Sequence, residues 1–271
     1  MNTISLPTKR PFSWKVFLLI VALIVPATYA ALPYAFTLQS VTLEAQELPF
    51  VMIGTLVNVL IYGVLAGIGL FLAARIGLGL PFIEGWLKKE PIRGRFREVL
   101  VLSVVIGVVA SLIILGLSLL VFKPPLQAEL GRLGITLPED IQPPAWQGFL
   151  ASFYGGIVEE VQLRLFLLTL LAWLGSLVRR DSEGRPTPVV FWIANILAAV
   201  IFGLGHLPAT AAIGLPLTTL VITRAIVLNG LGGLAFGWLY WKQGLESAML
   251  AHFSADIVLH VITPLVATLI V

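Results

Sequence analysis

The stretch from Trp146 to Val178 reads WQGFLASFYGGIVEEVQLRLFLLTLLAWLGSLV. A helix needs about 20 mostly apolar residues to cross a bilayer, and this stretch exceeds that length. Three ionisable residues interrupt it: Glu159, Glu160 and Arg164. Each costs roughly 2.5–3.5 kcal/mol at the centre of a membrane helix. The stretch therefore predicts a membrane-spanning helix whose charged residues serve a function.

The composition extends this prediction to the whole chain. Hydrophobic residues make up 58% and charged residues only 11% of the sequence, whereas a soluble domain is about one quarter charged. Long apolar runs recur from end to end, without the short alternating segments of a transmembrane β-barrel. We expect an all-α, polytopic membrane bundle of seven or eight transmembrane helices, integral to the plasma membrane of a prokaryotic cell.

The net charge of +3 does not indicate nucleic-acid binding. The basic residues cluster at the ends of apolar runs, where they orient a protein in the bilayer. The lipid bilayer is thus the expected partner, and nucleic acid is not. The chain has no cysteine, which excludes disulfides, thiol catalysis and cysteine-ligated metals. The first apolar run, which follows Lys9, Arg10 and Lys15, is interpreted as an uncleaved first helix.

Hydropathy and helix breakers divide the chain into spans. The predicted helices cover Trp14–Tyr34, Phe50–Arg75, Glu98–Phe122, Trp146–Val178, Pro188–Leu207 and Glu246 to the C-terminus. The stretch Ala209–Trp241 is either one long broken helix or two short ones. Gly63 and Gly67 form a face suited to close helix packing. The proline-rich, charged segment 123–144 marks the predicted boundary between an N-terminal part, residues 1–145, and a C-terminal core, residues 146–271.

The ionisable residues of the fourth span are the first candidates for a site. Glu160 and Arg164 lie at i,i+4, so they can pair on one helix face. A buried ion pair that tethers helices explains these two equally well. Glu159 points about 100° away around the axis and has no partner on its own helix. An isolated carboxylate of this kind is suited to accept and return a proton.

The chain has three histidines, all in the C-terminal part. His206 ends the sequence Phe-Gly-Leu-Gly-His, in which Gly203 and Gly205 leave room for another helix; it could also be a polar anchor at the interface. His252 and Asp256 share one helix face at i,i+4, and a mutual hydrogen bond would satisfy both. His260 belongs to no pattern and is interpreted as structural.

These residues occupy three separate apolar helices. Burying these polar groups separately would cost free energy of desolvation in each of the three helices. In one shared polar cavity they can form hydrogen bonds and ion pairs with one another. Glu159, His206, His252 and Asp256 are suited to activate a water molecule, either as a general base pair or as zinc ligands. The helical zinc signature His-Glu-x-x-His is missing.

Three ordered motifs resemble the CPBP family, the CAAX prenyl endopeptidase and bacteriocin-processing (Abi) intramembrane proteases, and in particular the type II CAAX prenyl endopeptidases. They are Glu-Glu-x-x-x-Arg at 159–164, Phe-x-x-x-His at 202–206 and His-x-x-x-Asp at 252–256. The glycine-rich run from Asn229 to Leu245 is also similar. The resemblance covers about 146–260.

The resemblance implies a helical fold with a polar intramembrane cavity and an endopeptidase that cuts a hydrophobic or prenylated, CAAX-like peptide. By analogy, Glu159 and His206 would activate water, and Glu160 with Arg164 would support the site. His252 and the residue at 256 would stabilise the oxyanion. The family has been described both as metalloproteases and as glutamate-dependent proteases, so zinc is an open expectation.

Two features depart from this pattern. Position 256 is Asp where Asn is common, and an ionised Asp cannot donate a hydrogen bond to an oxyanion. Either Asp256 is protonated in its apolar site, or it binds metal, or His252 alone is the oxyanion donor. The basic N-terminus and the basic loops after the second and fourth helices predict a cytoplasmic location for these segments. This places His206 nearer the outer face, whereas the prenyl proteases are expected to open toward the cytosol.

Two other functions fit the same polar residues. A proton-coupled transporter would use Glu159, His206 and Asp256 as a relay, but such proteins often carry paired broken helices in matching halves. A non-catalytic scaffold or immunity protein would keep the cluster for folding. The Gly233-x-x-x-Gly237 face serves either internal packing or dimerisation, so the oligomeric state stays open.

Overall fold

The computed structural model of the chain describes residues 3–4, 6–135 and 142–270, with side chains through residue 267. Over these residues the chain is 80% helical and contains no strand. Seven helical runs are long and apolar enough to cross a membrane. These seven runs confirm the predicted all-α polytopic bundle. The runs are Trp14–Leu38, Leu48–Ile76, Arg93–Leu133, Ala145–Val178, Pro188–Ala212, Thr219–Gln243 and Leu245–Ala267.

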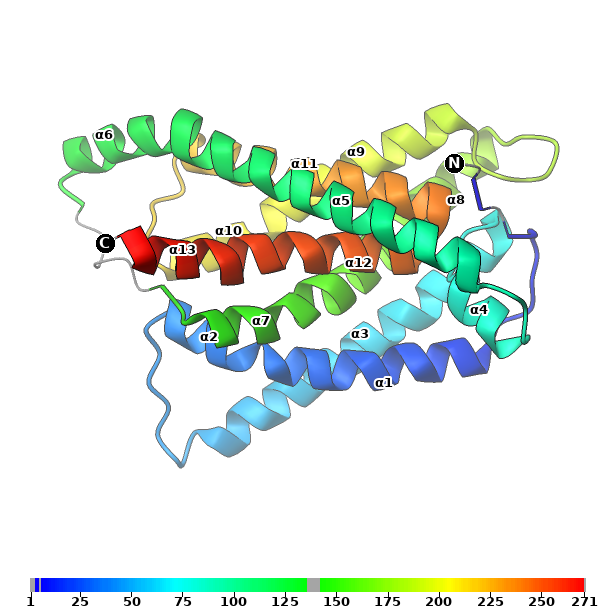
Figure 1. The fold of residues 1–271 in the computed structure, drawn as a ribbon, viewed down its shortest axis with the longest axis horizontal. Helices are drawn as coiled ribbons and strands as arrows, with labels where there is room; N and C mark the ends of the chain where they lie inside the picture. The colour runs from blue at the N-terminus through cyan, green and yellow to red at the C-terminus, as the bar shows by residue number, and fades with distance from the viewer. Residues whose placement is uncertain (1–2, 5, 136–141, 271) are drawn as a thin grey trace.

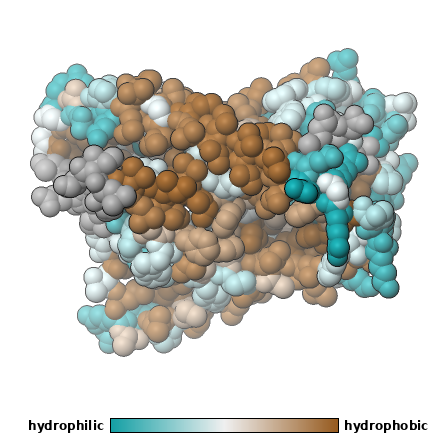
Figure 2. All heavy atoms as spheres, in the orientation of Figure 1, coloured by the Kyte–Doolittle hydropathy of each residue, from teal (hydrophilic) through white to brown (hydrophobic). Residues whose placement is uncertain are grey.

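The spans lie roughly along one axis, and their connections gather at the two ends of the bundle (Figure 1). The N-terminus, the helix at 81–87 and the loop at 179–187 lie at the right-hand end of the view. Figure 2 shows a largely hydrophobic middle between hydrophilic ends, as expected for a protein that crosses a bilayer. The right-hand end carries the basic segments that the charge distribution predicts to be cytoplasmic.

The first two spans pack together through glycines. They consist of α1 (Trp14–Ala30), the short α2 (Leu32–Leu38) and α3 (Leu48–Ile76). A Cβ added at Gly63 would lie 3.9 Å from Val21 of α1, and one added at Gly67 would lie 3.5 Å from Phe17. These contacts confirm that the glycine face of α3 serves close helix packing.

The third span is longer than the sequence predicts. It begins as α5 (Arg93–Leu117), passes through a π-helical turn, η1 (Ser118–Phe122), and continues as α6 (Lys123–Leu133). The prediction that the helix ends at Phe122 is therefore wrong. Pro124 and Pro125 closely follow the π-helical turn inside this continuous span, where each leaves a carbonyl of the preceding turn without its usual backbone N–H donor. Residues 136–141 of the predicted boundary segment lie outside the described residues.

The fourth span contains two π-helical segments around the glutamate pair. It consists of α7 (Ala145–Phe153), η2 (Tyr154–Glu159), η3 (Val161–Leu168) and α8 (Thr169–Val178). Glu160 is the residue between η2 and η3. π-Helical turns bond i to i+5 and are frequent at functional sites. They also change the directions of side chains relative to a regular α-helix.

The structure of the last three spans shows how the chain after His206, left open by the sequence, is organised. They consist of α9 (Pro188–Gly205), α10 (Leu207–Ala212), α11 (Thr219–Gln243), α12 (Leu245–Asp256), η4 (Ile257–Ile262) and α13 (Thr263–Ile270). The stretch 209–241 thus contains the end of a short helix, a loop and one long helix. Gly233 and Gly237 face α9, where added Cβ atoms would lie 3.0 Å from Ala199 Cα and 1.9 Å from Asn195 Oδ1. This glycine face therefore serves internal packing.

Spans from the N-terminal part hold the two helices that carry the candidate site. A Cβ added at Gly69 of α3 would lie 2.5 Å from the carbonyl oxygen of Leu165 in η3. One added at Gly107 of α5 would lie 2.2 Å from the carbonyl oxygen of Ala251 in α12. Only glycine allows backbones to approach this closely. The division into residues 1–145 and 146–271 stays a prediction.

A short helix at the basic end fixes the start of the last span. The backbone N–H groups of Phe82 and Ile83, in α4 (Pro81–Leu87), donate to Glu246 Oε1 of α12 at 3.0 and 2.9 Å. A carboxylate is favourable at a helix N-terminus because the first N–H groups have no helical partner. The sequence analysis did not predict α4.

Candidate active site

A buried ion pair lies at the centre of the candidate site. Arg164 Nη1 is 2.8 Å from Glu160 Oε1, and the two side chains are 2% and 0% exposed. This pairing agrees with the i,i+4 spacing in the sequence. Arg164 Nη2 also donates to the backbone carbonyl of Gly233 in α11 at 3.3 Å. The guanidinium therefore connects η3 to α11 and compensates the charge of Glu160.

His252 lies between the two adjacent glutamates. Its Nδ1–H donates to Glu160 Oε1 at 2.7 Å, and its Nε2 is 3.6 Å from Glu159 Oε2. An ionised carboxylate only accepts hydrogen bonds, so the bond to Glu160 fixes the proton on Nδ1 and directs Nε2 toward Glu159. Glu159, which lacks a partner on its own helix, thus gains one from α12. Its side chain is 23% exposed, whereas that of Glu160 is fully buried.

Asp256 extends this cluster along the last span. Its Oδ1 lies 3.7 Å from His252 Nε2 and 3.9 Å from His260 Nε2. The Nδ1 of His260 is 3.0 Å from the hydroxyl of Tyr34 in α2. His260, interpreted from sequence as structural, and Tyr34, which the sequence analysis missed, therefore continue the polar chain that starts at Arg164.

Two phenylalanines form one wall of the site. The His252 ring stacks on Phe236 of α11, with centroids 5.0 Å apart and planes 28° apart, and contacts the edge of Phe202 at 6.0 Å. The Arg164 guanidinium lies 5.1 Å from the centroid of the Phe202 ring and 5.5 Å from that of the Phe236 ring. This packing restricts the imidazole to one orientation. Phe202 belongs to a motif noted in the sequence, whereas Phe236 had no distinguishing signal among the apolar residues.

His206 directly follows the last residue of α9 and packs against Phe202 of the same aromatic wall. Its ring is 4.7 Å from that of Phe202, and its Nδ1–H donates to the Phe202 carbonyl oxygen at 2.9 Å. A carbonyl only accepts, so this bond leaves Nε2 of the neutral ring without a proton. Among the described residues no carboxylate lies within 4.0 Å of His206. The structure thus brings Glu159, Glu160, His252 and Asp256 together and connects His206 to them through Phe202.

Two glycines that the sequence analysis did not single out shape the site. A Cβ at Gly155 would lie 2.1 Å from Asp256 Oδ2 and 3.1 Å from His252 Nε2, and one at Gly156 would lie 2.9 Å from Phe253 Cβ. Both glycines are in η2, so this segment can approach α12 only without side chains there. A signal exists in the sequence, because Gly155 precedes Glu159 by four residues.

The placement of the candidate zinc donors can be described from the same geometry. Carboxylates and imidazoles are suitable zinc donors. However, no three His, Asp or Glu side chains in the described part of the chain are arranged to hold a metal ion. The bond from His252 Nδ1 to Glu160 is compatible with a metal at Nε2, but His206 is separated from the other donors. The residues as placed do not fit a metal site.

The arrangement can support hydrolysis. Glu159, the partly exposed carboxylate, lies beside an imidazole that a second, buried carboxylate holds in place. This is the pattern of a base with an oriented partner, in which hydrogen bonds and packing fix the imidazole. Of the three spans expected to converge, the fourth and the last meet directly, since Glu159 is 3.6 Å from His252, whereas His206 of the fifth is connected through Phe202.

Comparison with known proteins adds an independent observation. Residues 141–258 match the family model for type II CAAX prenyl endopeptidases, described as Rce1-like. The matched region includes every candidate site residue and ends two residues after Asp256. No curated protein and no solved structure matches the chain. Over residues 141–258 this multi-pass membrane protein is therefore similar to the Rce1-like type II CAAX prenyl endopeptidases.

Proposed function

We propose that this protein is an intramembrane endopeptidase that hydrolyses a hydrophobic or lipidated, CAAX-like peptide with water activated by Glu159. The observation that carries the proposal is the placement of two adjacent glutamates at opposite nitrogens of His252. The distances are 2.7 Å from Glu160 to Nδ1 and 3.6 Å from Glu159 to Nε2. The Rce1-like match over the same residues supports this reaction class.

In the proposed reaction Glu159 acts as the general base. Its carboxylate takes one proton from a water molecule, and the water oxygen forms a bond to the scissile carbonyl carbon. The carbon–nitrogen bond then breaks, and the proton passes from Glu159 to the leaving amine. The products are a carboxylic acid and an amine, and transfer of the acid proton to the amine gives a carboxylate and an ammonium group. Proton transfer of this kind contributes typically 10²–10⁴-fold to the rate.

Glu160 and Arg164 are proposed as positioning residues. Glu160 holds the Nδ1–H of His252, and Arg164 holds Glu160, so the imidazole presents Nε2 beside Glu159. His252 in turn is proposed to act as an imidazolium, whose Nε2–H donates to the oxygen that becomes negative in the tetrahedral intermediate. Such preorganised groups stabilise charge as it develops.

His206 and Asp256 receive different proposed roles. The Nε2 of His206 is free to accept a proton or a substrate hydrogen bond, because Nδ1 donates to Phe202. Asp256 lies near the Nε2 atoms of both His252 and His260. As a carboxylate it cannot donate to an oxyanion, so we assign it to orienting these two imidazoles.

The experiment uses the full-length chain purified in detergent. It is incubated with a fluorogenic peptide that ends in a farnesylated CAAX sequence, with the same peptide unprenylated and with an unrelated hydrophobic peptide. Mass spectrometry identifies the bond that is cut. We expect Glu159→Gln to lower kcat/KM on the cleaved peptide at least 100-fold, because it removes the base while keeping the shape of the side chain.

Glu98→Gln is the matched control, since Glu98 is an exposed carboxylate at the start of α5. It should retain activity within twofold of the unchanged protein. Full activity of Glu159→Gln, or absence of cleavage of all three peptides by the unchanged protein, contradicts the proposal. In the first case a scaffold or transport function would explain the polar cluster better.

Zinc dependence stays a separate prediction from the sequence. Elemental analysis of the purified protein, followed by chelation and addition of zinc, tests it directly. Zinc at one equivalent per chain, with loss and return of activity, would support it. Activity that survives complete chelation would contradict it.

A further inference from the structure

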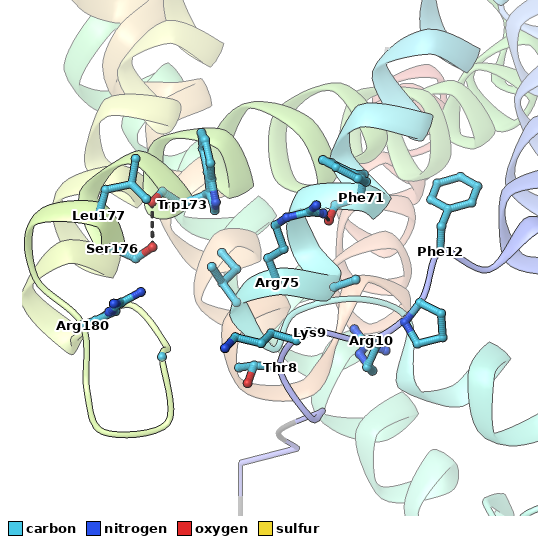
Figure 3. A pocket seen from close by; sticks show the side chains of 14 residues that line it. Thr8, Lys9, Arg10, Phe12, Phe71, Arg75, Trp173, Ser176, Leu177 and Arg180 are labelled. Atoms are coloured by element: carbon cyan, nitrogen blue, oxygen red, sulfur yellow. Dashed lines mark hydrogen bonds between the residues drawn. The ribbon is translucent and has the colours of Figure 1, made fainter.

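A basic cavity lies at the end of the bundle predicted to be cytoplasmic. It has a volume of about 550 Å³ and lies between the N-terminal segment, α3, α8 and the loop after α8. Among its lining residues are four basic side chains, Lys9, Arg10, Arg75 and Arg180, and no acidic one. In the view of Figure 3, Arg180 lies to the left of Lys9, Arg75 lies above it and Arg10 lies to its right.

Three of these four cations have no carboxylate partner. Arg10 is paired with Glu84 and also donates to the carbonyl of Leu78. Within the described ranges, Lys9, Arg75 and Arg180 form no ion pair. Arg75 is held by its own helix, where Nη1 donates to the Phe71 carbonyl at 3.0 Å and the guanidinium lies 3.4 Å from the Phe71 ring centroid. Three like charges around one cavity favour an anion there.

An apolar cavity continues from this basic one into the membrane region. It has a volume of about 840 Å³ and lies between α1, α3 and α8. None of its lining residues is charged, and three of them, Phe12, Phe71 and Trp173, also line the basic cavity. The two cavities therefore meet at these aromatic side chains.

The dimensions of the apolar cavity fit a hydrocarbon chain. Its lining follows α3 from Val59 to Leu72, which corresponds to about 20 Å at 1.5 Å per residue. One leaflet of the hydrocarbon core is about 15 Å thick. A chain that starts at the basic end and runs along α3 would thus reach through one leaflet.

We propose that the two cavities together bind one anionic glycerophospholipid of the cytoplasmic leaflet. Its phosphate lies among Lys9, Arg75 and Arg180, and one acyl chain lies in the groove between α1, α3 and α8. Anionic lipids are attracted to basic clusters at this membrane surface. Neither cavity is lined by Glu159, His252 or Asp256, so this site is separate from the proposed active site and does not depend on it.

The test measures lipid binding by native mass spectrometry of the full-length protein, released from detergent micelles containing phosphatidylglycerol or phosphatidylcholine. We expect phosphatidylglycerol to bind at least tenfold more tightly than phosphatidylcholine with the same acyl chains. The variant Lys9→Gln/Arg75→Gln/Arg180→Gln should lose at least tenfold of this affinity. The control Lys88→Gln/Arg93→Gln/Arg97→Gln, which removes three exposed basic side chains at the same end, should change it less than threefold.

Two further variants test the apolar groove and the basic cavity separately. Val64→Trp places a large ring in the apolar groove and should weaken binding of phosphatidylglycerol at least threefold without changing the charge. Arg180→Gln alone, in an exposed loop, should weaken it at least twofold and serves where the triple variant does not fold. Equal affinity for both lipids, equal losses in the two triple variants, or competition by inorganic phosphate as strong as by phosphatidylglycerol would overturn the proposal.

Discussion

At the scale of single residues, His252 is the most constrained side chain of the site. It donates to Glu160, faces Glu159 and Asp256, and stacks on Phe236. Burial of so many polar groups is favourable only when each finds a partner. Two buried atoms, Glu160 Oε2 and Arg164 Nη1, have no hydrogen-bond partner among the described residues, although Nη1 lies 2.8 Å from Glu160 Oε1 as an ion pair.

The ion pair between Glu160 and Arg164 should contribute to the stability of the fold. Arg164→Met removes the guanidinium and leaves the buried Glu160 without a cation. We expect the free energy of unfolding in detergent to fall by about 3–5 kcal/mol, the usual cost of removing one partner of a buried ion pair. Denaturant unfolding in mixed micelles measures this change.

The double variant Glu160→Gln/Arg164→Met is its control. Because it removes both charges, it should recover part of the lost stability. A single Arg164→Met variant within 1 kcal/mol of the unchanged protein would show that the ion pair does not support the site as described.

Some contacts between side chains of the site could be predicted from the sequence, and others could not. The spacing of Glu160 with Arg164 and of His252 with Asp256 predicted both same-helix contacts. The position of Glu159 against His252 could not be predicted, because it depends on the π-helical turns on both sides of Glu160 and on how closely α12 approaches them. Phe236 and Tyr34 were missed because an aromatic residue in an apolar helix carries no signal of its own.

At the scale of elements, the contact between η2 and α12 decides the geometry of the site. Gly155 and Gly156 let the two backbones approach, and an added Cβ at Gly155 would overlap Asp256. Flexible side-chain ends can move, but this carboxylate lies beside His252 at 3.7 Å. A small increase in volume here should therefore disturb the reactive groups before it disturbs the fold.

Gly155→Ala tests this point. We expect a loss of at least tenfold in kcat/KM on the cleaved peptide, with the elution volume and helical content unchanged. Gly116→Ala in α5 is the matched control, because nothing lies within 4 Å of an added Cβ there. Equal activity of the two variants would mean that the close approach at Gly155 does not position the site.

Element boundaries show where sequence patterns fail. Hydropathy located six spans and left 209–241 as one broken helix or two short ones. It ended the third span at Phe122, because two prolines and a lysine usually stop a helix. Here the prolines occupy the first turn of α6, and Thr218 at the start of α11 donates to Glu129 of α6 at 3.0 Å. This contact comes from a distant part of the chain, so no local pattern reveals it.

At the scale of the whole molecule, the N-terminal spans do more than anchor the chain. Close contacts at Gly69 and Gly107 place α3 and α5 against the helices that carry the site. The sequence predicted that these spans exist, but it could not predict which of them pack on η3 and α12. The Gly233 and Gly237 face illustrates the same limit, since a small-residue face indicates close packing without naming the partner.

The central claim is that the fourth and last spans meet at the glutamate pair, and the absence of cysteine makes this directly measurable. An added Cβ at Gly156 lies 2.9 Å from Phe253 Cβ, so the two Cβ atoms must separate by only about 0.6–1.6 Å to reach the roughly 3.5–4.5 Å found in a disulfide. The measurement is disulfide formation in the double variant Gly156→Cys/Phe253→Cys under mild oxidation in membranes, detected by mass spectrometry of the linked peptides. We predict a linkage in most of the protein and almost none in the control Gly54→Cys/Phe253→Cys, because nothing lies within 4 Å of an added Cβ at Gly54. Equal, low linkage in both variants would contradict the arrangement on which the proposed active site depends.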